Sequence, residues 1–223
     1  MSYTRFAIYY LPPPGPLADF GAAWLGWDVD AGKPVVQADV AGLQAATATP
    51  RKYGFHATLK PPFALADGCD PGDLARATAR MAASCAPAQC DGLQLHPMGR
   101  FLALTLAGEA ADVGRVAGSC VAELDRFRAP ASPAELARRR KPGLSPVQDV
   151  LLDRWGYPYV MEAFRFHMTL TGRLPADQIG FWTDTLQQLL PPLPAPFLLD
   201  QVALMGERPD GRFELIQRCR LAG

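Results

Sequence analysis

Two segments of the chain alternate apolar and polar side chains with the period of two that a half-buried β-strand requires. In residues 164–171 (FRFHMTLT), one face carries Phe164, Phe166, Met168 and Leu170, and the other carries Arg165, His167, Thr169 and Thr171. In residues 52–60 (KYGFHATLK), one face carries Tyr53, Phe55, Ala57 and Leu59, and the other carries Lys52, Gly54, His56, Thr58 and Lys60. Each segment therefore predicts a strand that buries an apolar face and presents a histidine and a threonine together on its polar face.

The remaining pattern predicts short strands and amphipathic helices. Strands are expected at residues 5–11, at 93–108 as a pair around a turn at 97–99, at 197–207 and at 212–222. Helices are expected at residues 17–28, 70–86, 109–127, 132–140, 145–156 and 176–190. The helix at 70–86 has the clearest start, because Asp70 suits the N-cap and Pro71 the first helical position. Trp24 and Trp27 are expected in the core, on one side of the first helix with Phe20.

The two halves of the chain share an order of elements: a histidine strand, a helix and then a two-stranded hairpin. His56 and His167 are the two matched positions, separated by half the length of the chain. This order indicates a diverged two-unit repeat. It predicts an α+β fold with mainly antiparallel sheets and helices packed on their outer side. Residues 1–223 are expected to form a single bilobal domain, with lobes at about 1–108 and 145–223, a helical connection between them and a central cleft.

Composition limits the classes of partner. Lys+Arg and Asp+Glu both number 22, so the formal net charge is zero, which argues against binding of long nucleic acid. The sequence has no run of 18 apolar residues and no signal-peptide pattern, so no membrane partner is expected. Five cysteines without a CxxC motif predict reduced, mostly packed thiols and a cytoplasmic location. A small local anion site is compatible with all of this.

The repeated motif Phe-His-x-Thr-Leu carries the candidate chemistry. With 10 Thr and 28 Leu in 223 residues, chance would place His-x-Thr-Leu at two of the three histidines about once in ten thousand such chains. Two facing histidines can divide the roles of general base and general acid, and a threonine hydroxyl on the same face can donate to an anionic oxygen between them. In-line displacement at a phosphodiester needs this combination. Lys60 and Arg165 could add positive charge, and Tyr10 could stack on a sugar or base.

These residues resemble a known family. The paired motifs are similar to those of the two-histidine (2H) phosphoesterase superfamily, also called LigT-like, which has an H-x-T/S motif in each of two lobes. The stretches RFAIYYLPPPGPLADFGAAWLGWD, PRKYGFHATLKPPF and GLSPVQDVLLDRWGYPYVMEAFRFHMTLTGRL resemble the branch assigned to phosphonate metabolism. The resemblance implies hydrolysis of a small cyclic phosphodiester, or of a nucleotide-like ester, without metal or other cofactor. It assigns His56, Thr58, His167 and Thr169 as catalytic residues.

Other interpretations of these residues stay open. Both histidines could be hydrogen-bonded core residues, although the duplication argues against this. A zinc site lacks a third ligand, because His96 precedes Pro97 at a hairpin turn and no cysteine lies near either motif. The basic run at 138–143 is either a solvated helix end or a lid over the substrate. Tyr10, Tyr157 and Tyr159 could stack on a sugar or base, or pack in the core or the cleft wall.

The sequence leaves the roles of the two histidines and the substrate undecided. Arg165 beside His167 would favour a neutral imidazole there, which weakly favours His167 as the base. A ribose cyclic phosphate from phosphonate breakdown is the expected substrate. The alternatives are an RNA 2′,3′-cyclic phosphodiesterase and a module that binds RNA ends or nucleotides without turnover.

Overall fold

The structure, a computed structural model of the chain, describes residues 3–140 and 143–223. Its centre is a seven-stranded sheet in the order β11-β10-β1-β4-β8-β7-β6, in which every neighbouring pair is antiparallel. The strands are β1 (Phe6–Tyr10), β4 (Ala57–Phe63), β6 (Gly92–Met98), β7 (Phe101–Ala107), β8 (His167–Thr169), β10 (Gln201–Glu207) and β11 (Phe213–Arg220). Two small sheets pair β2 (Trp27–Asp28) with β3 (Lys33–Pro34), and β5 (Ala88–Cys90) with β9 (Phe197–Leu199).

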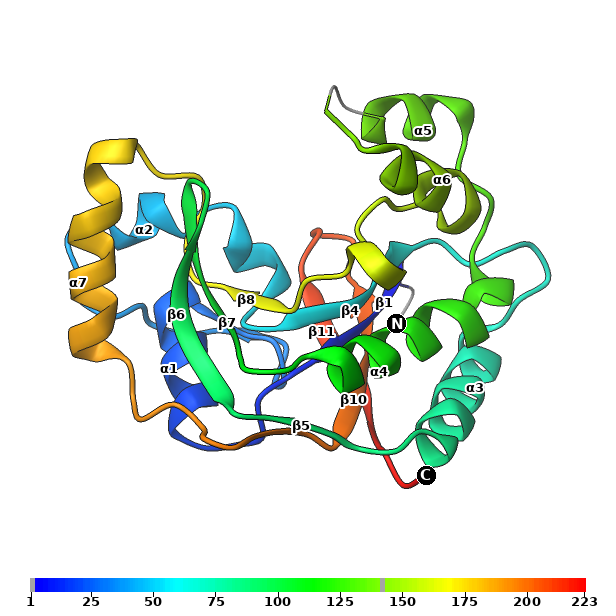
Figure 1. Cartoon of the computed structure of the whole chain (residues 1–223), viewed down its shortest axis with the longest axis horizontal. Coiled ribbons are helices and arrows are strands. Elements are labelled where there is room, and N and C mark those ends of the chain that lie inside the picture. Colours follow the sequence, from blue (N-terminus) through cyan, green and yellow to red (C-terminus); the bar gives the residue numbers. More distant parts are fainter. Residues whose placement is uncertain (1–2, 141–142) are drawn as a thin grey trace.

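The helices that form the main core lie on one face of the sheet, whereas α5 (Pro133–Arg139) and α6 (Pro146–Trp155) form a separate pair (Figure 1). The α-helices are α1 (Pro16–Leu25), α2 (Leu43–Ala46), α3 (Pro71–Ser84), α4 (Ala111–Glu123), α5 (Pro133–Arg139), α6 (Pro146–Trp155) and α7 (Ile179–Leu189). Short 3₁₀ turns are η1 (Pro50–Tyr53), η2 (Asp125–Phe127), η3 (Met161–Ala163) and η4 (Ala176–Gln178). Helix α4 packs on β4, α3 on β10 and β11, and α7 on β6 and β7. The expected α+β class with antiparallel pairing is confirmed.

Helix α3 begins with the cap that the sequence predicted, and α6 begins with a capping box that was not predicted. The Asp70 carboxylate accepts hydrogen bonds from the backbone N–H groups of Gly72 and Asp73 at the start of α3. Ser145 and Gln148 form a capping box at the start of α6. One turn differs from the prediction, since Pro97 lies within β6 and the hairpin turns after Met98. Pro97 is tolerated because β6 is an edge strand of the sheet.

Two apolar clusters occupy opposite faces of the sheet. In β1, Ile8 and Tyr10 belong to the main core under the helices, whereas Ala7 and Tyr9 belong to a smaller cluster on the other face with Phe213. Trp24 and Trp27 are buried as expected, but Trp24 lies in the main core and Trp27 in the smaller cluster, because α1 ends at Leu25, before Trp27. The smaller cluster supports one half of the cleft described below.

The sheet order shows that the two halves of the chain exchange hairpins. The β6–β7 hairpin follows β4 in sequence but pairs with β8, and the β10–β11 hairpin follows β8 but pairs with β1 beside β4. The expected division at residues 108 and 145 therefore does not separate two sheets. Strands β4 and β8 pair directly at the centre, so the sheet is continuous from one half to the other.

The cysteines are packed as expected: all five are free, and all but Cys69 are buried. Within the described ranges, no helix combines the length and the apolar character that a membrane crossing requires.

Candidate active site

The two histidine motifs lie side by side at the centre of the sheet. Ala57 of β4 pairs with Met168 of β8, and both side chains face the main core. Their neighbours along each strand point to the opposite face, where the antiparallel register sets His56 across from Thr169 and Thr58 across from His167. All four of these side chains line one cleft of about 920 Å³. The structure thus brings together the four residues that the sequence singled out.

Each of the two imidazoles is hydrogen-bonded to the backbone carbonyl of the residue two positions earlier in the chain. His56 Nδ1 lies 2.9 Å from the carbonyl oxygen of Gly54, and His167 Nδ1 lies 2.8 Å from that of Arg165. A carbonyl oxygen can only accept, so each Nδ1 carries the hydrogen and donates it. In the neutral ring the proton-accepting atom is therefore Nε2. At His56 this atom lies 3.0 Å from Thr58 Oγ1, whose hydroxyl donates to it.

His56 is supported by an aromatic residue that the sequence pattern did not reveal. The ring of Tyr9 stacks on the imidazole at a centroid distance of 3.7 Å and an interplanar angle of 23°. The pKa of His56 is lowered to about 4, chiefly by burial and to a smaller extent by the proximity of His167, while the bond to the Gly54 carbonyl opposes the shift. All five residues of β1 are apolar or aromatic and all are buried, so periodicity could not show which tyrosine faces the cleft.

Tyr10 does not contact the site. Its side chain is 2% exposed and packs in the main core against Phe166 and Phe197. Successive residues of a strand point to opposite faces, so the tyrosine on the cleft side of β1 is Tyr9. The buried position of Tyr10 contradicts the expectation that it stacks on substrate, and Tyr9 stacks on His56 instead.

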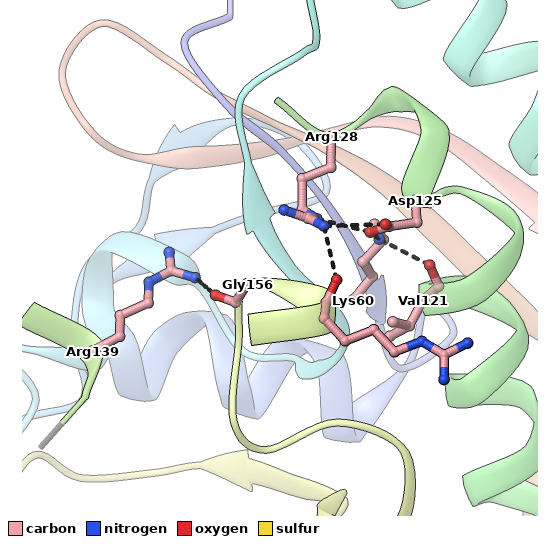
Figure 2. Close-up of polar contacts among 7 residues, drawn as sticks. Lys60, Val121, Asp125, Arg128, Arg139 and Gly156 are labelled. Atoms are coloured by element: carbon pink, nitrogen blue, oxygen red, sulfur yellow. Dashed lines mark hydrogen bonds and ion pairs between the residues drawn. The ribbon is translucent and has the colours of Figure 1, made fainter. Parts of the chain in front are cut away.

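Lys60 is also absent from the cleft lining, contrary to the prediction. A register shift in the β1–β4 pairing sets Thr58 opposite Tyr9 but Lys60 opposite Ile8, so Lys60 turns to the helical side. Figure 2 shows its ammonium donating to the carbonyl of Val121 at 3.0 Å, with Asp125 at 3.5 Å. Burial lowers the pKa of Lys60 to about 8, against the opposing effect of Asp125. Between these two pairs β4 has one residue more than β1, and this extra residue turns Lys60 to the other face. The alternation of apolar and polar residues in the sequence could not predict it.

Arg165 does line the cleft, as predicted. Its guanidinium donates to the neighbouring carbonyl of Phe164 at 2.9 Å and is otherwise exposed. It also borders a second hollow of about 910 Å³ beside the β6–β7 hairpin, which His96 lines as well. The two cavities adjoin, because both are lined by Met98, Phe101, Phe164 and Arg165.

Two arginines of the basic run at 138–143 have different surroundings, one as expected of a residue over the cleft and the other as expected of a solvated helix end. Arg139 lines the cleft, donates to the carbonyl of Gly156 and pairs with Glu135, whereas Arg140 is exposed and pairs with Asp149 and Asp153. Lys141 and Pro142 lie outside the described residues. Among the described residues of this run, Arg139 alone lines the cleft.

The helical hairpin α5–α6 and the segment after it form one wall of the cleft. Ser145, Gln148, Tyr157 and Tyr159 all line the cavity, a position that suits both substrate stacking and packing in the cleft wall for the two tyrosines. Arg128 of the segment after η2 donates to the carbonyl of Arg154 at 3.3 Å and holds the end of α6 (Figure 2). In the part of the chain that the structure describes, no group of three His, Cys, Asp or Glu side chains is placed to hold a metal ion.

Comparison with known families identifies one family that matches most of the chain. Residues 58–214 match the family described as "Protein of unknown function (DUF1045)". The chain belongs to this family. Within the DUF1045 match lie both threonines of the site and the second histidine, while the first histidine lies two residues before it.

Two curated relatives of this DUF1045 chain carry the name "Ribose 1,5-bisphosphate phosphokinase PhnN". The protein from Janthinobacterium sp. (strain Marseille) is 41% identical over 179 residues, covering 78% of this chain and 40% of the relative. The protein from Laribacter hongkongensis (strain HLHK9) is 36% identical over 190 residues, covering 80% and 42%. The chain thus spans about two-fifths of the length of the curated relatives it matches.

Solved structures similar to the DUF1045 chain include LigT of E. coli complexed with phosphate, with a TM-score of 0.49 and 12% identity over 100% of both chains. Another is TT0787 of Thermus thermophilus, with a TM-score of 0.47 and 18% identity over 98% of both chains. Both TM-scores are below 0.5, so the description of the fold rests on the strands and helices of the chain itself.

Proposed function

We propose that this protein is a metal-independent phosphodiesterase of the two-histidine type, which hydrolyses a small cyclic phosphodiester by paired acid–base catalysis. The observation that carries the proposal is the pair of His-x-Thr motifs on adjacent strands, in one cleft, with each imidazole held through Nδ1. This arrangement leaves two Nε2 atoms for proton transfer. Two threonine hydroxyls stand beside them as donors to phosphate oxygens.

In the proposed reaction, one Nε2 takes a proton from water while the water oxygen attacks phosphorus. The bond from phosphorus to the leaving oxygen breaks, and the other imidazole, protonated at Nε2, donates its proton to that oxygen. In the free protein the Thr58 hydroxyl donates to His56 Nε2, so in the proposed reaction it turns to a non-bridging oxygen and frees this Nε2 for proton transfer. The Thr169 hydroxyl donates to the other non-bridging oxygen as negative charge increases there. Arg165 supplies positive charge at the same cleft.

A ribose cyclic phosphate of phosphonate breakdown is the proposed substrate. Two considerations support it: the resemblance to the phosphonate branch of the superfamily, and the name of the curated relatives, which describes a kinase of a ribose bisphosphate. More than half of each relative lies outside the match, so the kinase name applies to those whole proteins. What links them to this proposal is the shared chemistry of a phosphorylated ribose.

A second candidate is hydrolysis or binding of a nucleoside 2′,3′-cyclic phosphate at an RNA end. The size of the site favours it, since the cleft of about 920 Å³ adjoins a hollow of about 910 Å³ and Phe101 and Phe164 line both. Such a space exceeds what one ribose phosphate fills, and aromatic rings can stack on a base.

Turnover of a substrate panel, with and without a chelator, tests the proposal. Cyclic phosphates of ribose and the four nucleoside 2′,3′-cyclic phosphates are incubated with the protein, and the products are followed by ³¹P NMR. We expect ring opening of ribose cyclic phosphate that is unchanged by EDTA. Faster opening of the nucleotides would favour the second candidate, and binding without turnover would favour the binding module. Loss of activity in EDTA would contradict a metal-independent mechanism.

A further inference from the structure

The two histidines of the cleft have unequal surroundings, although their motifs are alike. The imidazole of His56 is stacked on Tyr9, whereas the aromatic ring nearest His167 is Phe101, tilted by 59° at a centroid distance of 6.0 Å. Thr58 donates to His56 Nε2, and no corresponding contact joins Thr169 to His167 among residues 3–140 and 143–223. The duplication therefore supplies two imidazoles whose freedom of movement differs.

Tyr9 is itself fixed from several directions. Its side chain is 0% exposed, and its ring lies 5.7 Å from that of Phe213 on β11. Tyr53 of η1 packs on the same phenylalanine at 5.6 Å and lies 6.2 Å from His56. Because strands β1 and β11 and turn η1 all hold this aromatic group, the face it offers to His56 is rigid.

The groups that surround His56 supply no negative charge to an imidazolium. The π face of Tyr9 attracts a cation, but the loss of hydration outweighs this attraction, since the pKa of His56 is lowered. The titratable groups facing it are Tyr9 from β1, Tyr53 from η1 and His167 from β8. Nearby, Arg5 is neutralised by Glu207 of β10 through two hydrogen bonds of 2.5 Å. In the described part of the chain, no carboxylate is hydrogen-bonded or ion-paired to His56. A desolvated imidazole without an anionic partner favours its neutral form.

We infer that Tyr9 is a positioning residue that holds His56 neutral and in a fixed plane, so that His56 acts as the general base and His167 as the general acid. The inference rests on the proposed function for its catalytic part. It replaces the weak preference for His167 as the base, which was based on Arg165, because the guanidinium of Arg165 is exposed whereas the Tyr9 ring that stacks on His56 is fully buried.

The assignment fixes the direction of proton transfer. His56 Nε2 accepts a proton from water, the water oxygen forms the new bond to phosphorus, and the bond to the leaving oxygen breaks. His167, protonated beforehand, donates its Nε2 proton to that oxygen. After product release, His56 returns its proton to solvent and His167 takes one up. The rate should therefore fall on the acid side only as pH drops through about 4, where His56 becomes protonated, and not near the ordinary value of 6.5.

The ring of Tyr9, and not its hydroxyl, carries this role. The hydroxyl is buried and has no hydrogen-bond partner in the described residues. Tyr9→Phe should therefore keep the stack and the rate, whereas Tyr9→Leu removes the stack. Tyr10→Leu is the matched control, since it removes the same type of side chain from the next position of β1, on the opposite face.

Imidazole NMR tests the positioning without any substrate. In the wild-type protein and in Tyr9→Phe, we expect His56 to stay neutral with its hydrogen on Nδ1 down to about pH 4. In Tyr9→Leu the titration should move up by at least one pH unit, and in Tyr10→Leu it should not move. A wild-type His56 that is protonated at pH 6 would overturn the inference, as would equal shifts in the two leucine variants.

The dependence on the leaving group tests the assignment of roles. Methyl p-nitrophenyl phosphate needs little help from an acid, whereas methyl phenyl phosphate needs more. His167→Gln should lose about 10²- to 10⁴-fold on the phenyl ester and less than about tenfold on the nitrophenyl ester, while His56→Gln should lose about 10²- to 10⁴-fold on both. The reverse pattern would overturn the assignment and leave the two-histidine mechanism standing. Full activity of both variants on both esters would instead contradict the proposed function.

Discussion

At the scale of single residues, the carbonyl two positions before each histidine determines how the imidazole can react. Gly54 supplies this carbonyl for His56, and its backbone has φ 73° and ψ −179°, a region that only glycine occupies readily. A Cβ at this position would clash with the side chain of Val29. The glycine before the histidine is thus part of the site.

Gly54→Ala tests this requirement. We expect a loss of about 3 kcal/mol in the free energy of unfolding from strain and clash. We also expect at least a tenfold loss in kcat/KM, because the carbonyl that orients His56 moves. Gly211→Ala is the control, because it also has a positive φ of 78° but open space around it, and should cost about 1 kcal/mol with unchanged activity. Urea unfolding and steady-state kinetics measure both variants, and equal losses in the two would contradict the role of Gly54.

Single-residue patterns predicted the histidines and threonines because a motif that occurs twice is visible in the sequence. They could not predict Tyr9, since every residue of β1 is apolar or aromatic and buried, so the sequence does not show which residues of β1 face the cleft. They also failed for Lys60, because a register shift depends on how β4 pairs with β1 and not on the residues of β4 alone.

At the scale of elements, the consequence of that register shift is a polar link between β4 and the end of α4. Lys60 bonds the carbonyl of Val121, and Asp125 accepts from both Lys60 and Arg128, the latter at 2.7 and 3.1 Å. Arg128 also holds the end of α6. Strand β4 and the helical wall of the cleft are therefore joined through Asp125 and Arg128 (Figure 2).

Removing the Asp125 carboxylate should lower the free energy of unfolding more than removing the Lys60 ammonium. Asp125→Ala leaves a buried ammonium and a guanidinium unpaired, so we expect about 3 kcal/mol of destabilisation. Lys60→Met fills the same space and leaves Asp125 paired with Arg128, so we expect about 1 kcal/mol or less. Urea unfolding of the two variants measures the difference. If Lys60→Met were the more damaging, Lys60 would have a role beyond this link.

Helices were the easiest elements to predict, because caps such as Asp70 and Ser145 are local signals. Strand ends were harder. The second histidine strand spans only His167–Thr169, and the residues before Ala57 form a 3₁₀ turn where a strand was expected. Tertiary pairing sets these boundaries, so local alternation overestimates the length of the strands.

At the scale of the whole molecule, the exchanged hairpins make the two halves of the chain depend on each other. Each histidine strand lies beside elements from the opposite half of the sequence. The repeat predicted two related units correctly in the order of elements, but element order carries no information on which hairpin pairs with which strand. The cleft exists only when both halves are present.

Separate expression of residues 1–108 and 145–223 tests this dependence. Neither fragment can complete the sheet, because the first lacks β8, β10 and β11 and the second lacks β1, β4, β6 and β7. We expect both fragments to lack a cooperative thermal transition in circular dichroism. Cooperative unfolding of either fragment alone would show that its lobe is an independent folding unit.

The central claim is that His56 and His167 act as one catalytic unit in a single cleft. The most direct measurement is kcat/KM for a cyclic phosphodiester with the wild-type protein, His56→Gln, His167→Gln and the double variant, each shown by circular dichroism to be folded. Each single variant should lose about 10²- to 10⁴-fold, and the double variant should be little worse than the weaker single one, because residues that act together lose activity non-additively. Near-wild-type activity in either single variant, or losses that multiply in the double variant, would contradict the account.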